Sequence, residues 1–155
     1  LNAVAVFAIN KDLKLVIDDH FKDIRIQPLM QSVWTHLYRR SYAGPRRKLY
    51  AYFHEKRMEV FSFQQNRFRF SNSYEATHAH DALYYLLYIW KLTGMDADKD
   101  ELYLIGDPPH RDWLVEHIGQ YLKLYRVVDP ETDFGNIPLA GRKEIPYDLK
   151  AIYLG

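Results

Sequence analysis

The chain has 155 residues, of which 48% are hydrophobic and 15% aromatic, so it is long and apolar enough for one ordinary domain with a core and is not a disordered chain. It contains no cysteine, which excludes a disulfide framework or a thiolate metal site and favours the reducing cytoplasm as its location. Because 21 Lys and Arg face 20 Asp and Glu, the net charge is only +1, and we do not expect nucleic acid as a partner.

The first forty residues predict the element order β-α-β-α. Residues 3–9 form a short apolar run with β-branched members, as in a strand covered on both faces, and Asn10 can cap a helix that continues to about residue 22. Residues 24–27 have the pattern of a second short strand. A second helix is expected over 28–40, where a proline fits the first turn and the apolar residues form one stripe.

Three runs with period-two alternation follow, at 49–53, 58–63 and 68–70. The connection at 54–57 is short enough for a tight hairpin turn. These residues therefore predict an antiparallel meander of three strands.

A long helix comes next, which Thr77 can cap and which ends at Thr93, with Gly94 at the position where a left-handed residue is favoured. Its apolar run, 82–90, has about half the length that a membrane-spanning helix requires. We therefore expect a buried helix and no membrane insertion.

The remaining elements alternate between strand and helix. Residues 101–105 predict a buried strand that ends at Gly106, the prolines at 108–109 open a helix, and a last strand is expected over 124–128. The order from residue 48 is thus β-β-β-α-β-α-β with a mixed sheet. This α/β order is that of the ribonuclease H-like unit that actin-like ATPases contain twice.

Three segments are predicted from these patterns. Residues 1–47 form a β-α-β-α segment, 48–130 form the ribonuclease H-like subdomain, and 131–155 form an extension with enough apolar residues to pack back on it. The chain lacks an initial Met and enters a strand almost at once, so we expect that an N-terminal portion precedes it.

Three short motifs suggest a family. Asp81-Ala-Leu-Tyr-Tyr-Leu-Leu, Leu102-Tyr-Leu-Ile-Gly and Ile145-Pro-Tyr-Asp-Leu resemble an uncharacterised bacterial family, domain-of-unknown-function family thirty-eight twenty-two. The resemblance implies an actin-like ATPase fold, related to the pilus-assembly protein PilM, and no assigned activity. It also implies that this chain is the C-terminal part, with residues 3–40 ending the preceding half.

The phosphate-binding motifs of active actin-like ATPases are incomplete here. Those proteins carry Asp-x-Gly in the first hairpin, where glycine lets backbone N–H groups reach phosphate and the carboxylate holds a magnesium-bound water. This chain has Phe-His-Glu-Lys-Arg at 53–57, and Gly106-Asp107 stands where the adenosine motif has two glycines. We therefore expect no ATP hydrolysis. The alternative is that ATP and magnesium bind at Gly106, Asp107 and His54.

A metal-dependent nuclease is a third possibility. Nucleases of this shape hold two metal ions with carboxylates from the first strand, the first long helix and the end of the fourth strand, and Glu55, Asp81 and Asp107 stand near those places. However, Glu55 falls in a turn instead of mid-strand. Helix-dipole and turn preferences explain the two aspartates equally well.

The histidines near residue 80 are candidates for a metal site. His78 and His80 stand beside Asp81, and His54 could approach from the strands. However, two histidines two positions apart on a helix project about 200° from each other, so they cannot both bind one ion unless the helix starts later. A solvated helix N-terminus is the simpler interpretation. His117 falls on an apolar stripe and is expected to be a hydrogen-bonded core histidine.

The abundance of tyrosine, with 13 residues, points to protein contacts, because tyrosine and arginine are enriched at interfaces. A solvated basic loop explains the same arginines. Our leading hypothesis is a non-catalytic interaction or assembly module without a cofactor, whose partner is another protein or the missing N-terminal half of the fold. The candidate contact residues are Tyr38, Arg39, Arg40, Tyr42, Arg46 and Arg47.

Overall fold

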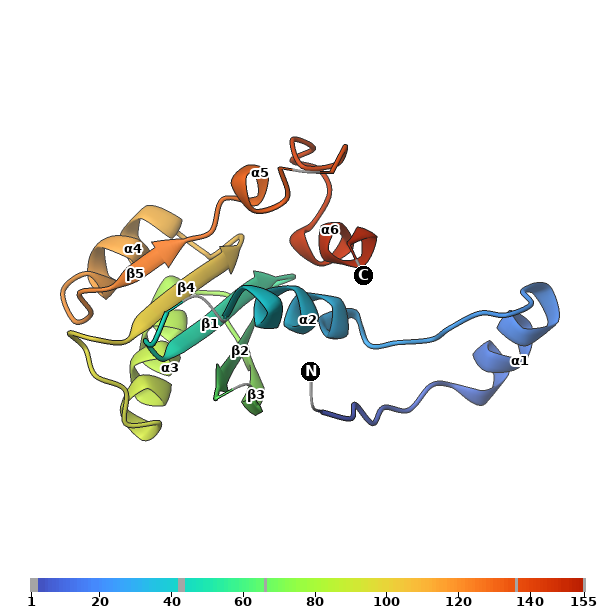
Figure 1. Ribbon diagram of the computed structural model, residues 1–155, viewed down its shortest axis with the longest axis horizontal. Coiled ribbons are helices and arrows are strands. Elements are labelled where there is room, and N and C mark those ends of the chain that lie inside the picture. Colours follow the sequence, from blue (N-terminus) through green and yellow to red (C-terminus); the bar gives the residue numbers. More distant parts are fainter. Residues whose placement is uncertain (1–2, 42–43, 66, 136, 155) are drawn as a thin grey trace.

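A computed structural model describes residues 3–41, 44–65, 67–135 and 137–154. Its centre is a five-stranded sheet with the strand order β3-β2-β1-β4-β5 (Figure 1). The strands are β1 (Lys48–His54), β2 (Arg57–Gln64), β3 (Arg67–Glu75), β4 (Glu101–Gly106) and β5 (Tyr125–Val127). The helices are α1 (Lys11–His20), α2 (Leu29–Ser41), α3 (Ala79–Leu92), α4 (Arg111–Ile118), α5 (Pro130–Asp133) and α6 (Tyr147–Tyr153).

The sheet is mixed, as predicted. β1 pairs antiparallel with β2 and β2 with β3, whereas β1 and β4, and β4 and β5, are parallel. Parallel neighbours need a crossover, and α3 and α4 supply the two crossovers. The predicted order β-β-β-α-β-α-β from residue 48 is therefore confirmed.

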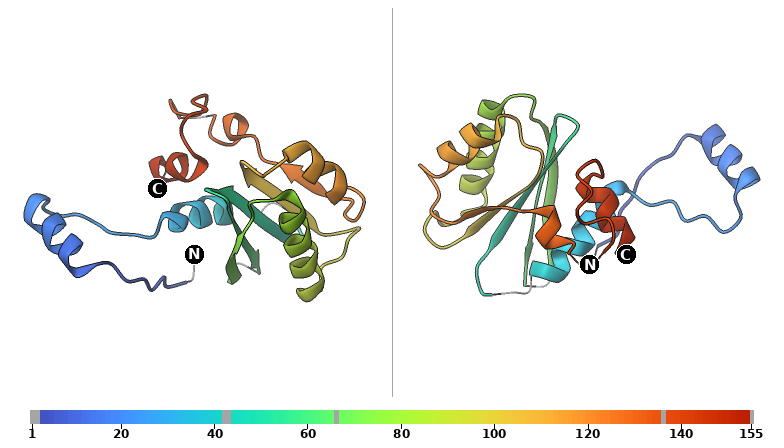
Figure 2. Two further views of the ribbon diagram at one scale, coloured as in Figure 1. Left: turned by 180° about the vertical axis from the view of Figure 1, so that it is seen from behind. Right: turned by 90° about the horizontal axis from the view of Figure 1, so that it is seen from above.

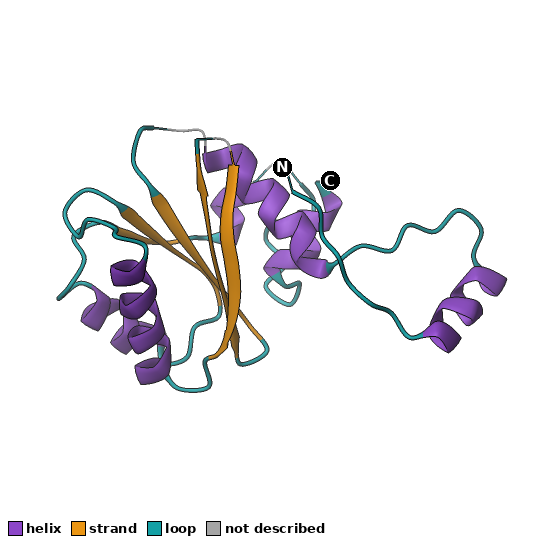
Figure 3. Cartoon of the chain, turned by 90° about the horizontal axis from the view of Figure 1, so that it is seen from below, coloured by secondary structure: helices purple, strands orange, loops and turns teal. Residues whose placement is uncertain are grey.

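Helices cover both faces of the sheet (Figure 3). On one face, α3 and α4 pack on alternate residues of the strands, including Leu49, Met58 and Leu104, which are fully buried. On the other face, α2 and the C-terminal segment cover aromatic residues such as Tyr52 and Phe61. β1 lies at the centre with both faces covered, which explains its continuous apolar pattern.

The C-terminal helix packs on α2. α6 lies against α2, and Tyr147 and Ala151 of α6 are buried in the same core cluster as Val33 and Leu37 of α2. The division into segments 1–47, 48–130 and 131–155 stays a prediction.

The two strands predicted near the N-terminus are not formed, and this part of the prediction was wrong. Residues 3–9 and 24–27 have no regular secondary structure. The helix α1 between them does form, and it has the predicted cap: Asn10 Oδ1 accepts hydrogen bonds from the N–H groups of Asp12 and Leu13 at 2.8 and 3.1 Å. A strand needs a neighbour for its backbone groups, and residues 3–28 extend away from the sheet (Figures 1 and 2). We call residues 3–28 the arm.

The start of α3 also differs from the prediction. The helix begins at Ala79, its N-cap is His78 without a side-chain capping bond, and the hydroxyl of Thr77 donates to Glu75 Oε1 at 3.3 Å. Thr77 stands one position before the N-cap, so it does not cap the helix. Gly94 has the predicted left-handed conformation, with φ of 62°. No helix in the described ranges is both long and apolar enough to span a membrane.

Candidate functional site

The largest of the cavities described here, about 740 Å³, opens at the carboxyl ends of the parallel strands β1 and β4. Open α/β sheets bind ligands at this edge. Three sequence-predicted residues, His54, Gly106 and Asp107, line the cavity together, with the first residues after β5 and the C-terminal segment 143–150 as further walls. We therefore treat this cavity as the candidate site.

Gly106 is required by the packing of β1 against β4. Its φ is 85°, and a Cβ atom at this position would lie 2.1 Å from the carbonyl oxygen of Phe53. The following N–H, that of Asp107, donates to the same carbonyl at 3.3 Å. This close approach of two backbones explains the glycine without any bound nucleotide.

His54 ends β1 and lies over Tyr52, with ring centroids 4.9 Å apart and nearly parallel planes. Its Nε2 is buried and has no hydrogen-bond partner among the described residues. Oε1 of Glu59 lies 3.7 Å from it, which is too long for a hydrogen bond. His54 is therefore held by stacking and has a ring nitrogen with unused bonding capacity.

The turn between β1 and β2 differs from a phosphate-binding loop. Glu55 and Lys56 have positive φ values of 44° and 64°, a combination that usually calls for Asn-Gly or Gly-Gly. Here both positions carry long side chains. The carbonyl of Lys56 also accepts the N–H of Ala76 at 2.8 Å, so the turn is tied to the end of β3. Without a glycine, the loop offers phosphate less access to its backbone N–H groups.

The charge of the cavity wall also opposes a polyphosphate. Its charged residues are the carboxylates of Glu55, Asp107, Asp129, Glu131, Glu144 and Asp148 and the cations of Arg111, Lys143 and Lys150. One of these cations is already used, because Lys150 Nζ donates to the carbonyl of Ala140 at 3.0 Å. The wall is thus net acidic and repels an anion unless a cation accompanies it.

One wall of the cavity is fixed by a buried network that the sequence did not reveal. Asp133, whose side chain is 7% exposed, lies 2.9 Å from Nε2 of His36 and 3.0 Å from Nη2 of Arg40, and it accepts a hydrogen bond from the hydroxyl of Tyr147. Burial raises the pKa of Asp133, but the bonds from His36 and Tyr147 and the charge of Arg40 outweigh burial and lower the pKa below its ordinary value. The network joins α2, α5 and α6.

Two tyrosines near the cavity are held in the neutral form. Burial, together with the neighbouring carboxylate of Asp148, raises the pKa of Tyr52. Burial and the carboxylate of Asp133 raise the pKa of Tyr147 in the same way. Neither phenol can therefore supply a phenolate near neutral pH.

Three of the four predicted contact arginines make ion pairs within the chain. Besides Arg40, Arg46 lies 2.9 Å from Glu101 and Arg47 lies 2.6 Å from Asp100. Arg39 is exposed on α2. The ring of Tyr38 packs edge-on against that of Phe63. Tyr42 lies outside the described residues.

The residues considered for a nuclease do not all meet. Glu55 and Asp107 line the candidate cavity, whereas Asp81 at the start of α3 does not. Across the described part of the chain, no group of three or more histidine, aspartate or glutamate side chains is placed to hold a metal ion.

The histidines near residue 80 line a separate cavity. His78 and His80 lie there with His110 and Trp113, and the ring centroid of His80 is 4.1 Å from that of Trp113. His117 stacks on the same tryptophan, and its Nδ1 lies 2.8 Å from the carbonyl oxygen of Trp113. His117 is thus partly buried and hydrogen-bonded, in agreement with the prediction.

The architecture places this chain among actin-like ATPase folds. It is similar to the crystal structure of a protein from Bacteroides thetaiotaomicron VPI-5482 that is described as having an actin-like ATPase fold and unknown function, with a TM-score of 0.77 and 20% sequence identity. The match covers 95% of this chain and 52% of that chain, so the chain spans about half the length of this structural neighbour. At this identity the likeness shows the fold alone.

The chain belongs to the family described as "Protein of unknown function (DUF3822)", whose sequence profile matches residues 1–124. The match includes the arm and ends before β5, so the closing motif at 145–149 lies outside it. No curated protein matches the sequence. The relation to PilM stays a prediction.

Proposed function

We propose that this protein is a non-catalytic module of actin-like fold that acts by binding protein through its arm. One observation carries the proposal: nine of the eighteen exposed large apolar side chains of the described chain lie in the 26 residues 3–28. They are Val4, Val6, Phe7, Ile9, Leu13, Leu15, Val16, Phe21 and Ile24. No residue of the arm is buried.

The arm exposes large apolar side chains to water, and burying them would stabilise the protein. Val4 and Val6 are 91% and 93% exposed, and burial of one such side chain stabilises a protein by about 1.5–3 kcal/mol. Large apolar side chains that are exposed in such number within one segment point to a protein contact. The sequence pattern of 3–9 and 24–27 is that of strands, so the contact we propose is pairing with the edge of another sheet.

The partner we propose is the other half of an actin-like fold, in the same chain or in a separate one. This rests on the comparison in which the chain, arm included, spans 52% of its structural neighbour. The second half of such a fold has a sheet of its own, and the arm would add a β-α-β unit to it. We place this assembly in the cytoplasm, in keeping with a sequence that has no cysteine.

A matched pair of substitutions in α1 tests the proposal. Val16→Asp changes a side chain that is 57% exposed, so in the 155-residue chain alone it should alter the free energy of unfolding by about 0.5 kcal/mol or less. In the natural protein, with any preceding sequence and any stable partner retained, the same change should cost about 2 kcal/mol or more, because it places a charge in an apolar contact. Lys14→Ala serves as the control and should be nearly neutral in both. An equally small effect of Val16→Asp in both settings would overturn the proposal.

Nucleotide binding with magnesium is the second candidate. It is favoured by the meeting of Gly106, Asp107 and His54 in a cavity of about 740 Å³, a volume within the roughly 300–1,000 Å³ of ligand pockets. The net acidic wall and the glycine-free turn count against it. We expect neither binding nor hydrolysis of ATP.

A thermal-shift titration with ATP and magnesium separates the two candidates. A ligand at a hundredfold excess over its dissociation constant stabilises the native state by about 2.7 kcal/mol, which raises the melting temperature of a protein of this size by about 5–10 °C. We expect no such rise. A clear rise that Asp107→Asn abolishes would support the nucleotide site and count against the non-catalytic module.

A further inference from the structure

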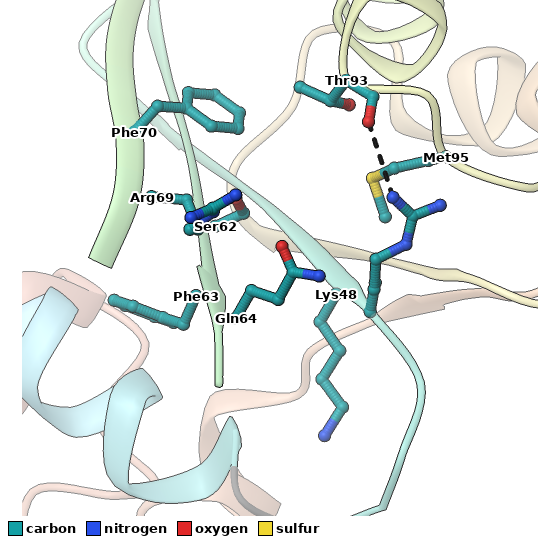
Figure 4. Close-up of a pocket in the computed structure, with 9 residues that line it drawn as sticks. Lys48, Ser62, Phe63, Gln64, Arg69, Phe70, Thr93 and Met95 are labelled. Carbon is teal, nitrogen blue, oxygen red and sulfur yellow. Dashed lines mark hydrogen bonds between the residues drawn. The ribbon is translucent and has the colours of Figure 1, made fainter. Parts of the chain in front are cut away.

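A second cavity lies at the opposite end of the sheet from the candidate site, where β1 begins and β2 ends (Figure 4). It has a volume of about 280 Å³. Its walls come from the start of β1, the end of β2, the middle of β3 and the end of α3. The lining residues are Arg47, Lys48, Ser62, Phe63, Gln64, Arg69, Phe70, Thr93 and Met95.

The lining of this cavity is basic and contains no carboxylate. Three of its nine residues are Arg47, Lys48 and Arg69, and its other polar groups are a serine, a glutamine and a threonine. The candidate site at the other end of the sheet has the opposite balance. The charge of the second cavity therefore suits an anion.

Two of the three cations are already engaged. Arg47 donates to the carbonyl oxygens of Thr93 and Gly94, at the end of α3, and pairs with Asp100 at 2.6 Å. Lys48 Nζ donates to the carbonyl oxygen of Ser41 at 3.2 Å. Lys48 therefore adds positive charge to the cavity and is less available for a direct contact with a bound anion.

Arg69 differs from these two. Its side chain makes no ion pair or hydrogen bond to any part of the chain that the structure describes, and the residue is exposed. Its guanidinium is therefore free to bind an anion, and guanidinium matches the geometry of phosphate and carboxylate groups.

A β-bulge explains why Arg69 reaches the cavity. Ser62 pairs with Phe70 and Phe63 pairs with Phe68, so Arg69 is an extra residue without a partner on β2. Consecutive residues of a regular strand face opposite sides, yet Arg69 and Phe70 both line this cavity. Bulges redirect side chains in this way and are common beside binding sites.

We propose that this cavity is a binding site for a compact oxyanion, a phosphate or carboxylate group with at most a small apolar body. The guanidinium of Arg69 would hold the oxygens, with the amide of Gln64 and the hydroxyl of Ser62, which Figure 4 shows on the same side of the cavity, as further hydrogen-bond donors. Phe70 and Met95 offer apolar contact. The volume lies at the lower limit of ligand pockets, so it suits one headgroup and not a nucleotide. The site is independent of the arm.

The test is a titration of the 155-residue chain, labelled with ¹⁵N, with inorganic phosphate and separately with phenyl phosphate. Saturable shifts are expected at the amides of Ser62, Gln64, Arg69 and Phe70. Arg69→Gln should weaken binding by about tenfold or more, as expected for loss of a charged hydrogen-bond partner. Arg67→Gln, which changes an exposed arginine of the same strand that does not line the cavity, is the matched control and should weaken binding less than about twofold.

The two ligands and two further variants make the result decisive. Tighter binding of phenyl phosphate would support a ligand with an apolar body, and equal binding would support the headgroup alone. Gln64→Leu should weaken the binding of both ligands. Arg69→Lys keeps the charge but loses the planar guanidinium, so its affinity should lie between those of wild type and Arg69→Gln. Shifts that do not saturate, or an equal loss in Arg67→Gln and Arg69→Gln, would overturn the proposal.

Discussion

Gly106→Ala is the substitution whose cost the structure defines most closely. An alanine there would have to adopt a φ of 85°, which costs about 1–2 kcal/mol for a residue with a Cβ atom. The same Cβ would lie 2.1 Å from the carbonyl oxygen of Phe53, a backbone atom, so β4 must move away from β1. That movement lengthens the hydrogen bond from Asp107, at a further cost of about 0.5–1.5 kcal/mol, and disturbs the packing of the central strand.

Gly94→Ala is the matched control for this prediction. Gly94 also has positive φ, 62°, but a Cβ atom there would meet nothing within 4 Å, so only the conformational cost applies. We expect a loss of about 1–2 kcal/mol for Gly94→Ala and about 3 kcal/mol or more for Gly106→Ala. Urea unfolding followed by tryptophan fluorescence measures both, since the chain has three tryptophans. Equal losses in the two variants would refute the argument that the strand contact, and not a bound nucleotide, requires Gly106.

Two further predictions concern the hydrogen-bond network of Asp133 and the cap of α1. Asp133→Asn should lower the free energy of unfolding by about 1–3 kcal/mol at neutral pH, because it weakens the bonds to His36 and Tyr147 and the ion pair with Arg40. Since the folded-state pKa of Asp133 lies below its ordinary value of 3.8, the stabilisation is complete above that value and disappears as the pH falls through the folded-state pKa. Urea unfolding at a series of pH values should therefore show the two proteins converging in acid, and a constant difference would contradict this role. Asn10→Ala should destabilise α1 by about 1 kcal/mol, because two capping bonds are lost. Circular dichroism should show a lower helix content, and an unchanged helix content would show that the cap is dispensable.

The sheet and its crossovers could be predicted from the sequence because local patterns determine them. The apolar run at 49–53, the alternation at 58–63, the short connection at 54–57 and the glycines at 94 and 106 are each local signals. The grouping of His54 with Gly106 and Asp107 was predicted from the places of the phosphate and adenosine motifs in actin-like ATPases. The structure brings these residues to one cavity because the ends of the parallel strands β1 and β4 meet at one edge. The closing of this edge by residues 143–150 did not follow from any local pattern.

The N-terminal strands were mispredicted for a physical reason. Residues 3–9 have the composition of a strand, but a strand also requires a paired neighbour, and the described chain offers none beside the arm. Long-range pairs were missed for a similar reason. His36 and Asp133 are separated by 97 positions. Arg46 and Arg47, which directly precede β1, form their ion pairs with residues at the start of β4. One sequence does not reveal such partners.

Hydrogen exchange of the arm tests the central claim most directly. Amide exchange of residues 3–28 would be measured in the 155-residue chain and in the natural protein with any preceding sequence and stable partner retained. The account predicts fast exchange at 3–9 and 24–27 in the chain alone, since these backbones lack strand partners, and strong protection of the same amides in the natural protein. Equally fast exchange in both samples would contradict the claim that this protein acts through its arm.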